Sequence, residues 1–172
     1  MKFIKSISTS IFTLLLCTAC ESDLEQVTYS SENAIPSTLS SLNDSYILES
    51  KNASQEAFTL TWSYPDLGYQ ASVINALEMD VKDKNFANKV ILASSKTDLS
   101  HTITVSDLNS KIMTLLKVYE METAPIGIEF RISSSISAAA DTLYSNIVST
   151  TITPYEGEPE YPERRTGDAH PR

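Results

Sequence analysis

The chain has 172 residues, of which 41% are apolar and only four are glycine, so it holds enough material for one ordinary domain with a hydrophobic core. Its formal net charge of −9 repels phosphate backbones and argues against nucleic acid as a partner. Both cysteines, Cys17 and Cys20, lie in the first 20 residues, so a folded domain further along must be stable without a disulfide.

The first 19 residues predict a secretory signal peptide. Lys2 and Lys5 precede an apolar run at 11–16, and small residues follow it. The run is too short to span a bilayer, and the absence of amphipathic pattern disfavours a buried helix. LCTAC at 16–20 resembles a bacterial lipobox, which implies that Cys20 carries a lipid that holds the protein at a membrane. Cleavage by ordinary signal peptidase near CTA, at 17–19, is the alternative.

Residues 20–42 predict an acidic, Ser- and Thr-rich tether with few apolar residues, ending in at most one short strand. Its start, ESDLEQ at 21–26, is similar to the acidic sorting signal that sends some Gram-negative lipoproteins to the outer face of the outer membrane. A solvated tether without such a signal is the other interpretation.

The first clear strand is predicted at 58–63, FTLTWS. Its period of two places Phe58, Leu60 and Trp62 on one face and hydroxyl-bearing residues on the other. Trp62 is the only tryptophan, and this period predicts that it lies in the core rather than at the surface as a platform for a sugar. The following YPDLG, at 64–68, is a predicted turn.

The stretch 73–82 predicts a second alternating strand. Glu78, Asp80 and Lys82 are predicted to face solvent, and Asn75 occupies an inward position where a larger residue is expected. The residues predicted to face the core are Val73, Leu77, Met79 and Val81. A polar turn at 82–89 follows.

One helix is predicted over 106–116. Ser106 is the expected N-cap, and Asp107 lies in the first turn, where its charge suits the helix dipole. The helical spacing defines an apolar face made of Leu108, Ile112 and Leu115.

The remaining elements are predicted strands at 90–95, at 101–106 with Ile103 and Val105 inward, at 126–133, and at 143–155. Roughly seven short strands at regular spacing predict an all-β, immunoglobulin-like antiparallel β-sandwich, with one short helix between the late strands. The domain is expected to span 43–155, and the proline-rich residues 156–172 are expected to form a disordered tail or a truncated linker.

An ordered series of segments resembles the N-terminal immunoglobulin-like domain of the SusE and SusF outer-membrane lipoproteins. The segments are FTLTWSYPDLGYQASV (58–73), LEMD (77–80), VSDLNSKI (105–112), FRISSS (130–135) and YSNIVSTTITPY (144–155). The resemblance implies a lipid-anchored surface protein of a starch- or glycan-utilisation system, with partners of the SusC and SusD type. In that family, carbohydrate-binding modules follow this domain and carry the sugar contacts. The sequence stops where those modules would begin, which puts direct glycan binding in doubt.

The sequence contains no pattern of an active site, a metal site or a phosphate-binding loop. His101 is expected to be solvated at the start of a strand, and the closely spaced glutamates of the tail lack a rigid support. Tyr64 and Tyr69, which flank the predicted turn, are the candidate glycan contacts, and packing of that loop is the alternative role for them.

The predicted function is a non-catalytic spacer or docking domain that needs no cofactor. The alternatives are a direct carbohydrate-binding module and a surface lipoprotein unrelated to glycans.

Overall fold

The computed structural model describes residues 34–68, 70–138 and 140–157. The predicted signal peptide, Cys20, most of the predicted tether and most of the predicted tail lie outside these residues. The elements in chain order are β1 (Ser45–Ile47), a 3₁₀ turn η2 (Ser50–Asn52), β2 (Glu56–Thr61), β3 (Ile74–Val81), β4 (Val90–Ser95), β5 (Ser100–Thr104), α1 (Val105–Val118), β6 (Ile126–Ser135), β7 (Leu143–Tyr144) and β8 (Val148–Thr153).

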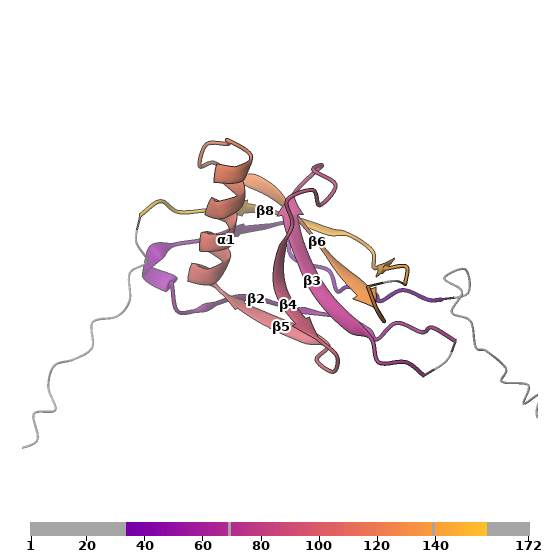
Figure 1. Cartoon of the computed structure of the whole chain (residues 1–172). Coiled ribbons are helices and arrows are strands. Elements are labelled where there is room, and N and C mark those ends of the chain that lie inside the picture. The colour runs from indigo at the N-terminus through magenta and orange to yellow at the C-terminus, as the bar shows by residue number, and fades with distance from the viewer. Residues whose placement is uncertain (1–33, 69, 139, 158–172) are drawn as a thin grey trace, which may run out of the picture.

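The strands form two sheets (Figure 1). Six of them make one sheet in the order β1-β8-β6-β3-β4, with β7 paired to β6, and β2 pairs with β5 in a separate two-stranded sheet. All these pairs are antiparallel except β1 and β8, which run parallel. The prediction of a mostly β domain with a single α-helix is confirmed, and its immunoglobulin-like class stays a prediction.

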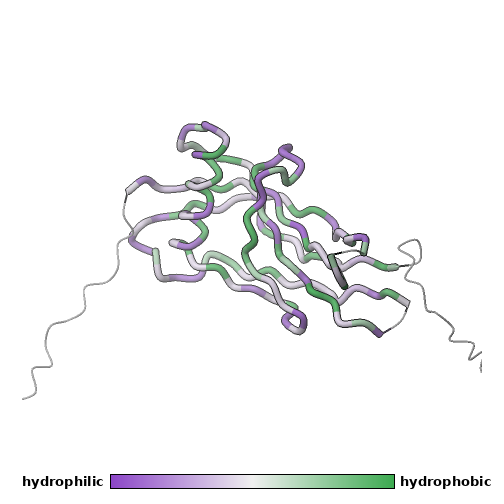
Figure 2. The backbone as a smooth tube through the Cα atoms, viewed as in Figure 1, coloured by the Kyte–Doolittle hydropathy of each residue, from purple (hydrophilic) through white to green (hydrophobic). Residues whose placement is uncertain are grey.

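The core lies between the large sheet on one side and the β2–β5 pair with α1 on the other. Phe58 of β2 meets Phe130 of β6 edge to face, with ring centroids 5.8 Å apart. Apolar and polar residues alternate along the strands, while the β4–β5 connection and the β3–β4 turn are mostly hydrophilic (Figure 2). Every residue predicted to face inward in and beside β2 and β3 is buried, including Trp62 directly after β2 and Val73 directly before β3. These strands therefore turn the faces predicted from their period of two toward the core.

The helix begins directly after β5, one residue earlier than predicted, and its N-cap is Thr104 rather than Ser106. Thr104 still has extended backbone angles, and its hydroxyl accepts a hydrogen bond from the Asp107 N–H at 3.3 Å, whereas Ser106 is already helical. The strand thus passes into the helix without a loop. The predicted apolar face is fully buried: Leu108, Ile112 and Leu115.

The predicted last strand is two strands, because the chain leaves the sheet between β7 and β8. In that gap, the side chain of Asn146 bonds to both backbone groups of Leu39: it accepts from the Leu39 N–H at 2.8 Å and donates to the Leu39 C=O at 3.1 Å. Segment 35–40 also pairs with the end of β2 and the residues after it. The N–H and C=O of Ile35 bond to Asp66 at 2.7 and 2.9 Å. The final residues of the predicted 20–42 tether are therefore packed onto the domain.

The described chain enters and leaves the domain at opposite ends (Figure 1). Its start lies beside the loop between β2 and β3, where Ile35 pairs with Asp66. Its end lies beside α1, where the Asn109 side chain accepts a hydrogen bond from the Tyr155 N–H at 2.9 Å and donates to the Tyr155 C=O at 3.1 Å. The fold therefore carries the chain from one end of the domain to the other.

Candidate functional site

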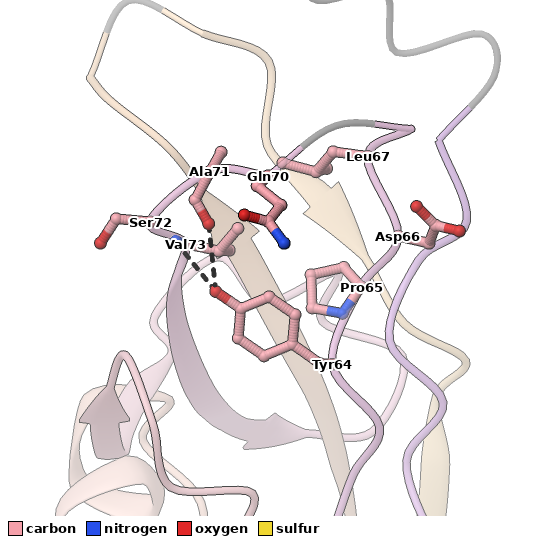
Figure 3. A pocket seen from close by; sticks show the side chains of 8 residues that line it. All are labelled: Tyr64, Pro65, Asp66, Leu67, Gln70, Ala71, Ser72 and Val73. Atoms are coloured by element: carbon pink, nitrogen blue, oxygen red, sulfur yellow. Dashed lines mark hydrogen bonds between the residues drawn. The ribbon is translucent and has the colours of Figure 1, made fainter.

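The loop between β2 and β3 contains Tyr64, one of the two predicted glycan contacts, and Figure 3 shows its surroundings. The Tyr64 hydroxyl accepts a hydrogen bond from the Val73 N–H at 3.1 Å and lies 3.4 Å from the Ala71 carbonyl oxygen, to which it donates. Across the turn, Asp66 accepts from the N–H of Gly68, which has a φ of +74° that suits glycine. The tyrosine hydroxyl therefore closes the loop. Tyr69 lies outside the described residues.

A cavity of about 500 Å³ opens beside this loop. Its lining is Tyr64, Pro65, Asp66, Leu67, Gln70, Ala71, Ser72 and Val73. Tyr64 is 43% exposed and its ring offers an apolar surface, and Gln70 and Ser72 supply an amide and a hydroxyl. Sugars bind where apolar ring faces are flanked by such polar groups. All the lining residues belong to one short loop, so the cavity provides a small contact area for a glycan.

Trp62 is not part of this surface. It is 6% exposed, belongs to the apolar core, and forms a bridge with Leu39 of the N-terminal segment. Its indole Nε1 has no hydrogen-bond partner among the described residues. The hypothesis that Trp62 forms a sugar platform is therefore wrong, because neither face of its ring is open to solvent.

The largest departure from the sequence-based expectations concerns Glu78, which was predicted to face solvent and is only 2% exposed. It lies on the sheet face opposite Leu77, as the strand period requires. However, Lys89 of the neighbouring turn and Arg131 of β6 cover it, with ion-pair distances of 2.5 and 2.8 Å. Burial by itself raises the pKa of the Glu78 carboxyl, but the hydrogen bonds from Lys89 and Arg131 outweigh it and hold the pKa below its ordinary value.

Arg131 is held between two aromatic rings. Its guanidinium lies 4.0 Å from the centroid of the Phe86 ring and 3.9 Å from that of Tyr144. Phe86 is buried although its turn was predicted to be polar, and its φ of +56° is strained for a bulky side chain. This turn therefore folds over the outer face of the sheet and covers the Glu78–Arg131 pair, which leaves Glu78 only 2% exposed.

Asp80 was also predicted to face solvent and is fully buried. Its carboxylate accepts hydrogen bonds from the N–H groups of Val81 and Asn88 at 2.7 and 3.1 Å, and from the Tyr119 hydroxyl at 2.9 Å. Tyr119 is the C-cap of α1, so Asp80 ties the helix end to the β3–β4 turn. Both buried carboxylates are occupied by contacts within the domain and neither lines the cavity described above.

His101 was expected to be solvated, but the structure places it in a partly covered position on β5, with its Nε2 atom buried and unpartnered within the described part of the chain. The nearby Asp98 carboxylate accepts from the Ser95 hydroxyl at 2.9 Å.

Across residues 34–157, apart from the two undescribed positions, no group of three or more His, Cys, Asp or Glu side chains is arranged to hold a metal ion. The same residues include no helix that is long and apolar enough to cross a membrane.

Comparison with known proteins identifies a family. Residues 22–132 match the family described as SusE outer membrane protein, a stretch that runs from the predicted tether into β6. No curated protein matches the chain. Because the matched residues make up more than half of the sequence, the chain belongs to the SusE family of Sus-type outer membrane proteins.

Proposed function

We propose that this protein is a non-catalytic, lipid-anchored surface protein of a SusE-like starch- or glycan-utilisation system, and that its folded domain is a spacer or docking module. In this proposal Cys20 carries the lipid, the domain faces outward from the outer membrane, and the partners are of the SusC and SusD type. The family membership and the LCTAC sequence at 16–20 support this proposal.

The spacer role is supported by the positions at which the chain enters and leaves the domain. The termini of a domain often lie close together, so that the domain projects sideways from its attachment. Here Ile35 lies beside the β2–β3 loop, and Tyr155 lies beside α1 at the other end of the domain (Figure 1). A domain with this path adds its own length between whatever is attached at its two ends.

The buried positions of the chemically reactive groups support a non-catalytic role. Glu78 and Asp80, the most deeply buried carboxylates among the described residues, are each bonded to partners in the domain. General acid–base chemistry needs a carboxyl group within hydrogen-bond reach of a substrate. Both groups are covered by the 82–89 turn and by side chains of neighbouring elements, so their arrangement is that of structural ion pairs and hydrogen bonds.

Direct carbohydrate binding is the second candidate, and the cavity beside Tyr64 is the observation that favours it. The exposed ring of Tyr64 and the nearby Gln70 and Ser72 match the composition of a weak sugar site. The Tyr64 hydroxyl, however, is already bonded to the loop backbone, so it is less available for a ligand.

The docking proposal is tested by purifying the tagged full-length chain from gently solubilised outer membranes of its native host. The expected result is co-purification with a TonB-dependent porin and a SusD-type protein. The matched control is Tyr64→Ala, which should co-purify with the same proteins. Recovery of the chain without them, together with retention on immobilised polysaccharide that Tyr64→Ala abolishes, would favour the second candidate instead.

A further inference from the structure

We propose that this domain is a mechanically resistant element, which withstands unfolding when it is pulled by its two ends. The inference rests on the proposed spacer role, because only a domain placed in series between two attachments experiences such a load. It is carried by three features of the fold: the opposite positions of the two ends, the bonding of the N-terminal stretch to both sheets, and the parallel pairing of β1 with β8.

The N-terminal stretch 35–48 bonds to both sheets along its length. Its first part runs beside the end of β2, where backbone hydrogen bonds join Ile35 to Asp66, and the Ser40 N–H to the Thr61 C=O at 2.9 Å. In the middle, Leu39 is bound on its other side by the Asn146 side chain, which belongs to the β7–β8 connection of the large sheet. A force on the start of the domain is therefore shared between the two sheets from the first residues onward.

The second part of this stretch is β1, which is paired with β8 in parallel and in the register Ser45↔Thr151 to Ile47↔Thr153. Further backbone bonds extend the pair at both ends, from the Thr151 N–H to the Asp44 C=O and from the Leu48 N–H to the Thr153 C=O, each at 2.9 Å. In a parallel pair the hydrogen bonds between the strands are evenly spaced and run at a slant across the strand direction. These bonds therefore resist sliding of one strand along the other.

The positions of the two ends determine how a load acts on this pair. Tension at Ala34 pulls β1 back toward the β2–β3 loop, while tension at Gly157 pulls β8 toward the α1 end (Figure 1). Because the strands are parallel, the two pulls are opposite in direction and slide β1 along β8. In this shear geometry the bonds between the strands carry the load together, whereas peeling the strands apart would break them one at a time.

The C-terminal end of the described chain is hydrogen-bonded to the domain in the same manner as its N-terminal end. Asn109 of α1 bonds both backbone groups of Tyr155, as Asn146 does for Leu39. The Thr150 hydroxyl also donates to the Asn43 C=O at 2.8 Å, which adds a side-chain bond across the β1–β8 pair. Both ends of the domain are thus tied to its interior before the load reaches the strands.

The test is single-molecule pulling of the full chain between two marker domains, one attached at each end. Asn146→Ala removes two bonds on the load path at an exposed residue. Leu92→Ala is the matched control, because β4 lies at the far edge of the sheet and pairs only with β3. Forced unfolding follows the unfolding barrier rather than equilibrium stability, so the two variants can be separated.

The expected result is a distinct unfolding force for the wild type, a lower force for Asn146→Ala, and an intermediate one for Asn146→Asp, which keeps the acceptor for the Leu39 N–H. Leu92→Ala is expected to lower the denaturant midpoint and leave the force unchanged. The proposal is overturned if the wild type unfolds without a measurable force, or if the force follows the denaturant midpoint in both variants. The measurement contains neither glycan nor partner, so failure of the docking or binding assays does not affect it.

Discussion

Trp62→Ala is expected to destabilise the domain by about 3–5 kcal/mol, the usual range for deleting a large buried aromatic side chain. The side chain is 6% exposed and packs in the apolar core, so its removal leaves a cavity between the two sheets. The indole Nε1 has no hydrogen-bond partner among the described residues, and losing an unsatisfied buried donor offsets part of the cost. The lower half of the range is therefore expected. Trp62→Phe, which keeps an aromatic ring and removes the donor, should cost less.

The assay is thermal and denaturant unfolding of the purified chain without residues 1–19, the predicted signal peptide. For a domain of this size, a loss of about 3 kcal/mol lowers the Tm by roughly 10–15 °C. The control is Ile47→Ala, because Ile47 is 76% exposed and its truncation should change stability by no more than about 0.5 kcal/mol. If Trp62→Ala melts within a few degrees of the wild type, Trp62 is not in the core, and its role as a sugar platform has to be considered again.

Two further predictions concern the anchor and the buried acid. Metabolic labelling with an alkyne fatty acid should mark the wild type and not Cys20→Ser, and equal labelling of both would show that Cys20 is not the lipid-bearing residue. The pKa of Glu78 is lower in the folded than in the unfolded chain, so its contribution to stability is fully present above its ordinary value of 4.5 and is lost as the pH falls through the folded value. Glu78→Gln should therefore lower the free energy of unfolding by about 1–3 kcal/mol at neutral pH and by progressively less in acid. The measurement is the denaturant midpoint of both proteins across pH. A loss of stability that does not depend on pH would contradict the lowered pKa of Glu78.

The faces of the strands could be predicted from sequence because each strand has one apolar side. Phe58, Leu60 and Trp62 alternate with hydroxyl residues, and all three are buried as the period requires. The helix could be predicted for the same local reason, through the spacing of its apolar residues. Its N-cap was misplaced because Thr104 and Ser106 are both good capping residues, and only the backbone angles of Thr104 decide between them.

The buried carboxylates could not be predicted because their burial is caused by residues distant in sequence. The period correctly places Glu78 on the face opposite the core, but Arg131 of β6 and the Phe86 turn cover that face. Packing of segment 35–40 was missed for a similar reason. It contains one buried apolar side chain, Leu39, and is held mainly by backbone bonds that leave no pattern in the sequence. The cavity likewise depends on how the loop around Tyr64 closes.

The most direct test of the proposed spacer or docking role is calorimetric titration of the purified chain with starch fragments and other common glycans. The account predicts no binding tighter than millimolar, because Trp62 is buried and the loop offers one exposed described ring, whose hydroxyl already bonds to the backbone. Tyr64→Ala and Tyr69→Ala are the matched variants and should give the same result as the wild type. A micromolar signal that either substitution abolishes would contradict the account and make the domain a carbohydrate-binding module.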